Sequence, residues 1–423
     1  MKNYLVCDGK KIQEQSYIWN SIGGLLNAGQ SALLLMVISR TNSAYDAGIY
    51  SIGYAIACLG LTVGCFGIRN YQSTDVSDKY SFSTYFSTRI VTDICMFILV
   101  LYYVFKGVFF LDYSYSKCVV VLLLGLLKMV DSVEDVFHGM YQRHGRLDIA
   151  GRCATTRYGV MIASFTLALC LTHNLVIAAF ISLLCSLGYF LFTIFLTFHV
   201  FNQTITIKIF DKNILYLLRE NVSLFIGGFL ALYIANAPKY AIDEFRSEVE
   251  QACFSYIFMP VYVVNVLNSF IYQPMLSKMA LLYSENKRKE FINMFFRQIL
   301  FIFSLIIVIL IGSYLLGIPV LSFLFNIELN EYKMAFMVLM IGSCFLAMEG
   351  YIAAIITVMR KQAWLVVGYV VTAIVIISMA RKVVLISGVL GAAILYSSGI
   401  CIQMLVFIIL FFIFWNVKGE NNV

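Results

Sequence analysis

The sequence has few charged residues. Only 13% of its 423 residues are charged and 61% are hydrophobic, whereas a soluble domain has roughly 25% charged residues. Its four histidines have no metal-ligand spacing, and its eleven cysteines, mostly scattered through apolar runs, form no CxxC pair. A Walker A loop, a GxSxG elbow and an HExxH motif are all missing from the sequence. These features argue against ATP hydrolysis, predict neither a metal nor a cofactor, and indicate a polytopic membrane protein.

Long apolar runs fill most of the sequence. About twelve of them reach the roughly 17–25 residues that a membrane-spanning helix needs. The first six lie between Tyr17 and Phe198 and the last six between Val222 and Trp415, with the polar stretch Asn202–Glu220 between the two sets. We therefore predict an all-α polytopic membrane protein with an N-terminal six-helix lobe (1–201), a cytosolic connector (202–220) and a C-terminal six-helix lobe (221–423).

Basic residues are distributed unevenly over the predicted loops. An even number of spans places both termini on one side, and if that side is the cytosol, the cytosolic segments hold most of the 30 Lys and Arg residues. The positive-inside rule then predicts cytosolic termini in a cytoplasmic membrane. The polar start of the chain, with Lys2, Lys10 and Lys11, differs from a cleavable signal peptide. The predicted outer loops are too short for an external catalytic domain, so we do not expect an enzyme. We also expect no nucleic-acid partner.

A weak internal repeat supports the division into two halves. Gly23-Gly24 at the first predicted span corresponds to Gly227-Gly228 at the seventh. These two pairs are 204 positions apart. At the same spacing, a second set of residues corresponds pairwise: Asp46, Gly48, Tyr50 and Ser51 with Glu250, Ala252, Phe254 and Ser255. Because six spans separate the copies, the halves have the same orientation in the membrane, which predicts pseudo-two-fold symmetry about an axis along the membrane normal.

The stretch Leu126–Gly139 breaks the apolar pattern without breaking the predicted helix. One helical face carries its polar groups: Lys128, Asp131, Glu134, Asp135 and His138. A charged side chain at mid-membrane costs roughly 2.5–3.5 kcal/mol even on lenient insertion scales, so these groups cannot face lipid. Two interpretations remain open: the wall of a polar translocation cavity, or the cytosolic end of a helix whose charges reach water.

Four other sites each have a functional and a structural interpretation. Pro260 removes a backbone hydrogen bond within the predicted eighth span and is either a hinge or a static kink. Glu349 is the only strong acid deep in the C-terminal half, and it is either a coupling-ion ligand or a hydrogen-bonded structural acid. Lys239 is a cation near the predicted outer mouth or a snorkelling lysine. Arg143 and Arg146 belong to a basic loop that topology alone explains, but their guanidinium groups also suit uptake of an anionic lipid headgroup from the cytosol.

Several segments together resemble the Wzx-type polysaccharide flippases. That family belongs to the multidrug/oligosaccharidyl-lipid/polysaccharide (MOP) exporter superfamily, which also holds multidrug-and-toxin extruders (MATE) and the lipid flippase MurJ. The segments that carry the resemblance are Gly67–Gln72 with Asp75, Asp131–Gly139, Tyr141-Gln142, Gly145-Arg146, Pro238–Ile242, Tyr256–Pro260 and Phe270–Pro274. It covers roughly residues 17–300, and the last four spans match in hydropathy only.

The resemblance implies two six-helix lobes around a central cavity, with alternating access driven by an ion gradient or membrane potential. It implies a polyprenyl-pyrophosphate-linked oligosaccharide as cargo, for the synthesis of O-antigen, capsule or exopolysaccharide. A polysaccharide polymerase and glycosyltransferases would then be expected partners, and H⁺ or Na⁺ the coupling ion. A pyrophosphate headgroup needs cations, and the candidates are Arg40, Lys128, Lys239 and Arg381.

Two other functions compete with this interpretation. A cation-coupled multidrug antiporter of the same fold would instead use acids of the cavity, and its candidates are Asp131, Asp135 and Glu349. These same acids are the candidates for ion coupling in a flippase. A membrane-bound sugar polymerase or acyltransferase is disfavoured, because the sequence offers neither long outer loops nor an evident base–nucleophile pair.

The spacing of Lys128, Asp131 and Asp135 suggests a coupling mechanism. All three share one helical face, so we expect the lysine to pair with both acids, each partner lowering the desolvation cost of the others. An incoming pyrophosphate would compete for Lys128 and release an acid to bind a proton or sodium ion.

Overall fold

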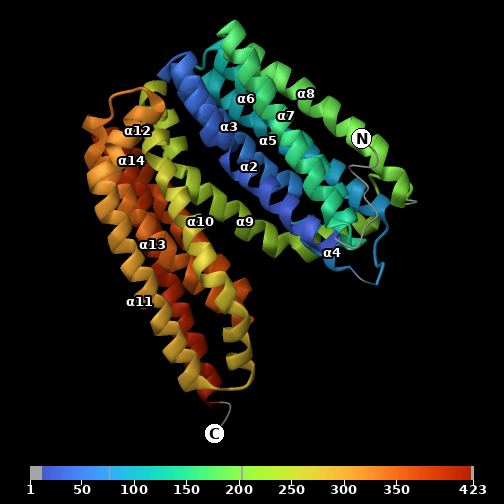
Figure 1. Cartoon of the computed structure of the whole chain (residues 1–423), viewed down its shortest axis with the longest axis vertical. Coiled ribbons are helices and arrows are strands. Elements are labelled where there is room, and N and C mark those ends of the chain that lie inside the picture. The colour runs from blue at the N-terminus through green and yellow to red at the C-terminus, as the bar shows by residue number, and fades with distance from the viewer. Residues whose placement is uncertain (1–11, 76, 202, 421–423) are drawn as a thin grey trace. The chain divides into compact units, whose positions relative to one another are not determined.

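The computed structural model describes residues 12–75, 77–201 and 203–420 (Figure 1). Across these residues the chain forms helices and connecting turns, with no β-strand. Its contacts divide it into two compact units, Met1–Phe229 (unit 1) and Leu230–Val423 (unit 2), which we describe separately. The basic N-terminal residues Lys2, Lys10 and Lys11 lie outside the described residues.

Unit 1 is a bundle of long helices. Its elements are α2 (Ile12–Thr41), α3 (Ala44–Cys65), α4 (Ile68–Thr74), α5 (Phe82–Phe110), α6 (Tyr115–Arg143), α7 (Leu147–Thr172), α8 (Leu175–Thr197), η1 (Phe198–Phe201) and the first part of α9 (Lys212–Phe245). Polar side chains define where several of these helices begin. The Ser43, Ser81, Ser114 and Asn174 side chains accept hydrogen bonds from backbone N–H groups at the starts of α3, α5, α6 and α8.

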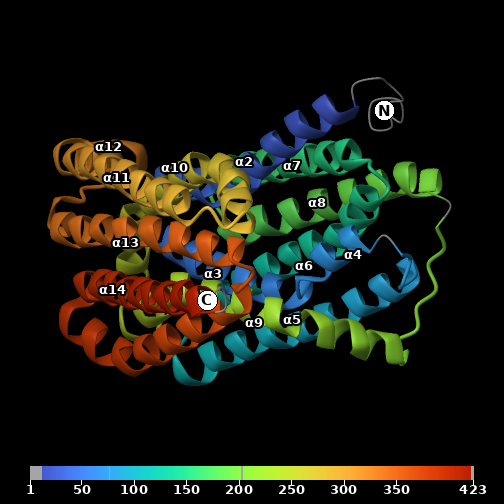
Figure 2. The ribbon, with the colours of Figure 1, turned by 90° about the horizontal axis from the view of Figure 1, so that it is seen from below.

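Helix α6 lies at the centre of unit 1. It packs against α3, α4, α5, α7 and α8, and Figures 1 and 2 both draw it within the blue-to-green bundle. Nineteen of its residues are buried, including most of its charged ones. The charged face predicted from the sequence is therefore covered by neighbouring helices rather than exposed to lipid, which resolves how this polar helix can belong to an apolar bundle.

Unit 2 is the second bundle. It holds the end of α9, then α10 (Glu248–Ser284), α11 (Arg288–Gly312), η2 (Ser313–Gly317), α12 (Ile318–Phe325), η3 (Asn330–Tyr332), α13 (Lys333–Val358), η4 (Gln362–Trp364) and α14 (Leu365–Glu420). A capping box of Ser247 and Glu250 begins α10. Helix α13 packs against α10, α11 and α14, and thus occupies the middle of this bundle.

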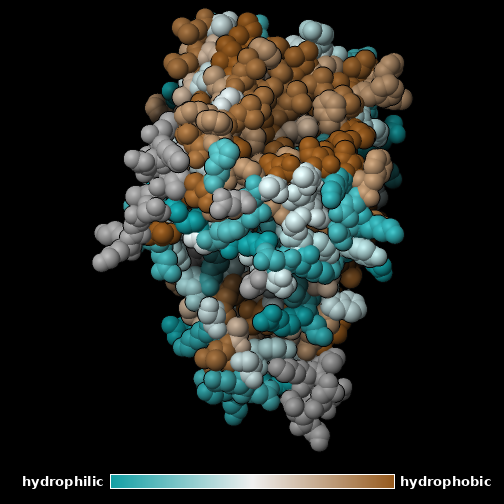
Figure 3. Space-filling view, turned by 90° about the vertical axis from the view of Figure 1, so that its right-hand side faces the viewer, coloured by the Kyte–Doolittle hydropathy of each residue, from teal (hydrophilic) through white to brown (hydrophobic). Residues whose placement is uncertain are grey.

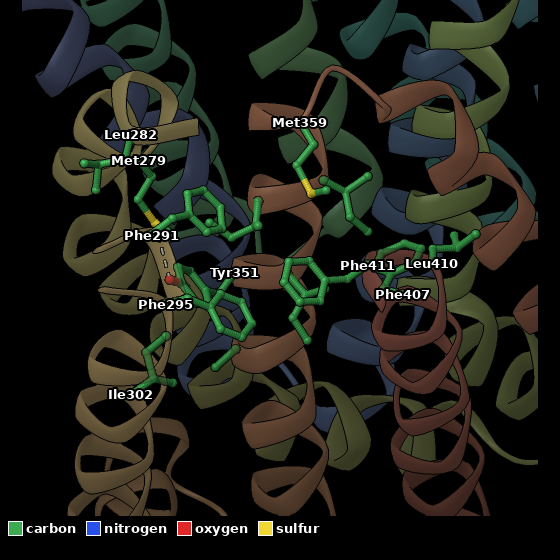
Figure 4. Close-up of a cluster of buried hydrophobic side chains, with 14 of the residues drawn as sticks. Met279, Leu282, Phe291, Phe295, Ile302, Tyr351, Met359, Phe407, Leu410 and Phe411 are labelled. Carbon is green, nitrogen blue, oxygen red and sulfur yellow. Dashed lines mark hydrogen bonds between the residues drawn. The ribbon is translucent and has the colours of Figure 1, made fainter. Parts of the chain in front are cut away.

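Stacked aromatic side chains lie within the buried hydrophobic cluster of unit 2 (Figure 4). Phe295 of α11 stacks on Phe411 of α14 with ring centroids 4.8 Å apart and on Tyr351 of α13 at 5.6 Å. The Tyr351 hydroxyl donates a hydrogen bond to the Met279 sulfur of α10 over 3.5 Å. Four helices of this unit therefore meet through apolar contacts at one level of the bundle.

Among the described residues, ten helices are long and apolar enough to span a membrane. Helix α6 is not one of them because of its charged face, although its 29 residues are long enough to span. Helix α14 runs from Leu365 to Glu420, but Gly388, with φ of 53°, breaks its helical geometry and divides it into two parts. Counting α6 and the two parts of α14 separately accounts for the predicted twelve.

The surface has the character of a multi-pass membrane protein. Large apolar side chains on α8, such as Phe180, Leu184, Leu191 and Phe195, are exposed. On the face drawn in Figure 3, hydrophobic residues gather into a broad area that gives way to a hydrophilic zone. Exposed apolar surface of this extent needs a lipid or protein environment.

The predicted connector is largely attached to unit 1. The backbone of Thr204, Thr206 and Lys208 exchanges hydrogen bonds with the hydroxyl groups of Ser83 and Ser87 on α5. Helix α9 already begins at Lys212, within the stretch 202–220 predicted as a connector. The Lys79 ammonium lies 2.6 Å from the Glu220 carboxylate, which ties the first turns of α9 to the α4–α5 loop.

Candidate functional site

The charged face of α6 is the core of a buried polar network. Its residues recur every three or four positions, so that they share one side of the helix. The neighbouring helices supply oppositely charged side chains on that side. The network has two parts, which we call the Arg157 cluster and the Arg89 cluster after the arginine at the centre of each.

The Arg157 cluster joins α6 to α7 and α8. The Arg157 guanidinium donates to Asp131 over 2.6 Å, to Glu134 over 2.9 Å and to the Ser186 hydroxyl over 2.8 Å. The Lys128 ammonium donates to the other Asp131 oxygen over 2.7 Å and lies 5.0 Å from the centroid of the Tyr54 ring. Arg157 is 1% exposed and Lys128 is 2% exposed. Both cations therefore depend on these acids to offset the hydration that they lose on burial.

The Arg89 cluster joins α6 to α3, α4 and α5. The fully buried Arg89 guanidinium donates to Asp135 over 2.9 Å and to the Gly64 carbonyl over 2.6 Å. Arg69 donates to the second Asp135 oxygen over 3.2 Å. The Ser132 hydroxyl donates to Asp93 over 2.5 Å. Asp135 therefore bridges two arginines from different helices.

The network is close to electrically neutral. With ordinary protonation, its acids are Asp93, Asp131, Glu134 and Asp135, and its cations are Arg69, Arg89, Lys128 and Arg157. Breaking a buried ion pair by removing one partner is strongly destabilising, because the other charge then lacks compensation. Neutrality within the bundle is thus the condition that allows these charges to be buried.

The pairing predicted for Lys128 is half correct. Lys128 pairs with Asp131, as the three-residue spacing indicated. Asp135 pairs instead with Arg89 and Arg69, because these arginines reach its side of α6 from α5 and α4. Both N-terminal ion-coupling candidates, Asp131 and Asp135, are therefore held by arginine in this structure.

Sequence reasoning missed the role of Arg89 and Arg157. The positive-inside rule places both among the basic residues of the cytosolic side. The structure corrects this assignment, since each is 1% exposed or less and bonded to acids of α6. The signal was present in the sequence, because both arginines lie at or inside predicted apolar spans.

The candidates for headgroup binding have different environments. In unit 1, Arg40 is exposed in the last turn of α2, whereas Lys128 is buried in the Arg157 cluster. In unit 2, Lys239 is 8% exposed, with its ammonium 5.9 Å from the centroid of the Phe258 ring. Arg381 is exposed on α14. Arg40 and Arg381 are therefore open to solvent or lipid, while Lys128 and Lys239 are held within their bundles.

Glu349 is the buried acid of unit 2. It lies on α13 with 5% of its surface exposed, and the Gln403 amide of α14 donates to it over 2.8 Å. The second Gln403 polar atom, Oε1, is buried without a hydrogen bond. Among the described residues, Glu349 thus has an amide partner in place of the cations that surround the acids of unit 1.

The predicted uptake residues are engaged with nearby acids. Arg143 contacts the Asp78 carboxylate, and Arg146 donates to Asp148 over 3.0 Å. Arg143 also lines a pocket of about 280 Å³ that includes the buried Gln72 and the exposed His144. A larger opening of about 870 Å³ is lined by uncharged polar residues of α2 together with Glu14 and Gln142.

Asp75 organises the loop between α4 and α5. Its carboxylate accepts hydrogen bonds from the backbone N–H groups of Lys79 and Tyr80 and from the Tyr85 hydroxyl over 2.8 Å. Burial alone would raise the pKa of Asp75, but these donors and the nearby Arg143 outweigh it and lower the pKa below its usual value. Asp75 therefore contributes as a carboxylate to holding this loop.

Pro260 lies inside α10, and the helix continues through it. It lines an apolar pocket of about 430 Å³ together with residues of α12, α13 and η2. A proline at this position leaves the carbonyl one turn earlier without its usual helical donor, which weakens the helix locally.

No protein-family profile matches this sequence. The chain is 23% identical over 331 residues to the capsular polysaccharide biosynthesis protein CapF of Staphylococcus aureus, an alignment that covers 77% of this chain and 80% of CapF. Its structure resembles an inward-facing MATE multidrug transporter of the MOP superfamily, with a TM-score of 0.70, 13% identity, and coverage of 96% of this chain and 99% of that one.

Two further solved structures are similar. The lipid II flippase MurJ in an inward closed conformation matches with a TM-score of 0.70 and 13% identity, over 95% of this chain and 87% of MurJ. A MOP superfamily transporter from Pyrococcus furiosus matches with a TM-score of 0.55 and 13% identity, over 97% of each chain. This multi-pass membrane protein therefore has the two-lobe fold found in MATE transporters and in MurJ.

Proposed function

We propose that this protein is a flippase for a polyprenyl-pyrophosphate-linked oligosaccharide repeat unit. It would move this lipid from the inner to the outer leaflet of the cytoplasmic membrane, with both termini in the cytosol, for capsule, O-antigen or exopolysaccharide synthesis. The observation that carries the proposal is the similarity to CapF over three quarters of the chain, because CapF is named for capsular polysaccharide biosynthesis. The MATE- and MurJ-like fold supports transport by alternating access rather than catalysis.

The charges of unit 1 fit an anionic cargo better than a cationic drug. Asp131, Glu134 and Asp135 each have an arginine partner. A site for an organic cation needs an acid whose charge is not already compensated. In contrast, a pyrophosphate can compete with Asp131 for Lys128, because phosphate oxygens accept the same charge-assisted hydrogen bonds. Exposed Arg40 and Arg381 remain proposed contacts for the headgroup, and Arg143 and Arg146 remain proposed uptake residues.

The test compares lipid flipping with drug transport by the same preparation. Purified protein in liposomes receives either a fluorescent polyprenyl-pyrophosphate oligosaccharide or a fluorescent organic cation. We expect the lipid to become accessible in the opposite leaflet and the cation to stay where it was added. Transport of the cation without flipping of the lipid would overturn the proposal in favour of the second candidate, the ion-coupled multidrug antiporter, which the MATE likeness favours.

Substitution of Lys128 tests its role in cargo binding. Lys128→Ala should abolish glycan export in a strain lacking its own flippase, and Lys128→Arg should retain part of it. Lys128→Ala also leaves Asp131 with one cation fewer, so the paired variant Lys128→Met/Asp131→Asn separates folding from binding by keeping the cluster neutral. The exposed Lys289 gives the matched control, Lys289→Ala. Normal export by the paired variant would assign Lys128 a purely structural role.

Pro260 remains the proposed hinge of α10. Pro260→Ala restores a helical hydrogen bond and should slow transport more than it lowers the amount of protein in the membrane. Equal losses in both measurements would indicate that Pro260 serves packing around its apolar pocket.

A further inference from the structure

Two polar atoms of α6 face each other without a hydrogen bond. The Glu134 Oε1 oxygen and the His138 Nε2 nitrogen are 3.7 Å apart, one helical turn from each other. Their side chains are 4% and 8% exposed. Both atoms are fully buried and have no hydrogen-bond partner. Native proteins satisfy most buried polar atoms, so a facing pair of unsatisfied ones requires a specific explanation.

The rest of Glu134 is held firmly. Its other oxygen, Oε2, accepts from Arg157 over 2.9 Å, and Arg157 is anchored in turn by Asp131 and Ser186. Both Arg157 contacts with Glu134 are made to the Oε2 oxygen. Oε1 is left directed at the imidazole, at a separation beyond the 2.7–3.2 Å range typical of an N–H···O bond.

We propose that the Glu134–His138 pair is a proton-binding site within unit 1. A proton from the aqueous phase binds between Nε2 and Oε1 and makes one hydrogen bond that satisfies both atoms. The network then gains one positive charge, because its acids, Glu134 included, and its cations already balance. The inference rests on the proposed flippase function only where it concerns coupling. It supplies an acceptor oxygen that Asp131 and Asp135 do not offer, since both oxygens of each aspartate are bonded to cations.

The surroundings of the pair determine how it responds to pH. The charged groups that act on it come from three helices: Arg69 of α4, Asp131 and Asp135 of α6, and Arg157 of α7. The Asp135 charge is shared in turn with Arg89 of α5. The neutral titratable groups beside Glu134 are Tyr141 of α6 and the Cys153 thiol and Tyr158 of α7. The fixed arginines oppose the added proton and the neighbouring acids favour it.

A gain of one positive charge beside Lys128 and Arg157 also couples the proton to the cargo. A protonated pair attracts an anionic headgroup more strongly than an unprotonated one, so cargo and proton should favour each other's binding. If one proton moves in each transport cycle, a gradient of one pH unit changes the equilibrium ratio of cargo between the two leaflets by about tenfold.

The direct test is ¹⁵N NMR of histidine-labelled full-length protein in nanodiscs. The chain has four histidines, and Asn replacement of His144, His173 and His199 leaves His138 as the only signal. Asn suits position 173 because that residue has a left-handed backbone, with φ of 49°. We expect the Nε2 resonance of His138 to shift as the pH falls and the midpoint to move in Glu134→Gln. An Nε2 resonance that stays unchanged across the pH range in which the protein remains folded would overturn the proposal.

Transport provides the second readout. The flipping rate is measured in liposomes under pH gradients of opposite sign. For wild-type protein and the control His173→Asn, we expect the rate to differ between the two gradients. Glu134→Gln and His138→Gln should flip at a rate that does not depend on the gradient. A gradient response preserved in both variants would refute the role in coupling. If no preparation flips the lipid but the His138 resonance still titrates, the proposed cargo is wrong and the proton site stands.

Discussion

The two units of this protein are stabilised at their centres by different interactions. The central helix of unit 1, α6, is surrounded by arginines that neutralise its acids. The central helix of unit 2, α13, carries one buried acid, Glu349, with an amide partner, and otherwise packs through an apolar cluster that includes stacked aromatic rings. Ion pairs are directional, and removing any one partner leaves the others without compensation. In aromatic packing, the stability lost on substitution instead grows with the side-chain volume that is removed. Unit 1 should therefore be the more sensitive of the two to single charge changes, and unit 2 to changes of side-chain size.

Arg157→Met should have the largest effect. It leaves Asp131 and Glu134 buried with too few cations, which by analogy with other buried pairs costs about 3–5 kcal/mol. We expect a lower unfolding temperature in detergent and little protein in the membrane. The exposed Arg381→Met is the control.

Compensating changes sharpen this prediction. Asp131→Asn and Glu134→Gln combined with Arg157→Met and Lys128→Met remove the charges together and should recover much of the stability. If Arg157→Met alone is as stable as wild type, the network does not support unit 1 in the way proposed.

Phe295→Ala tests the aromatic core of unit 2. Removing a ring that stacks on Phe411 and Tyr351 leaves a cavity, and we expect a loss of about 3 kcal/mol. Phe295→Leu, which keeps most of the volume, should cost less than half as much. Thermal unfolding followed by near-ultraviolet circular dichroism measures both variants. Equal losses for Ala and Leu would indicate that ring stacking, rather than volume, stabilises this unit.

Asp75 provides a smaller effect with a defined pH dependence. The pKa of Asp75 is lower in the folded protein than in an unfolded chain, so its contribution is complete above the unfolded value and is lost as the pH falls through the folded one. Asp75→Asn should cost about 1–2 kcal/mol at neutral pH, and this difference from wild type should shrink in acid. Unfolding temperatures measured from neutral to acidic pH give the comparison. A difference that is constant with pH would contradict a role for the carboxylate charge.

Glu349→Gln should have the smallest effect on stability. The glutamine keeps a carbonyl oxygen that can accept from Gln403, so we expect a change below about 1 kcal/mol. The same variant tests the proposed ion-coupling role of Glu349. Lost export at normal stability would support coupling through unit 2, while normal export would leave this acid a structural one.

The sequence was sufficient to predict the helices and their apolar character. Hydrophobic runs and the breaks between them are local features, and each predicted span has a corresponding helix, including α6 and the two parts of α14 around Gly388. Most observed helices extend a few residues beyond the apolar runs, because capping residues such as Ser81 and Ser114 define their starts. The extent of the connector was less predictable, since its polar residues are compatible with the first turns of α9.

The sequence by itself also determined which residues of α6 share a face, and hence the Lys128–Asp131 pair, because helical spacing brings residues three positions apart together. Only the tertiary structure decided the partners that come from other helices. Arg89 reaches Asp135 from α5, and Arg157 reaches Asp131 and Glu134 from α7. Nothing in the local pattern specifies these pairings, since they depend on how separate helices pack. The same packing leaves Glu134 and His138 facing each other, each with one unsatisfied atom.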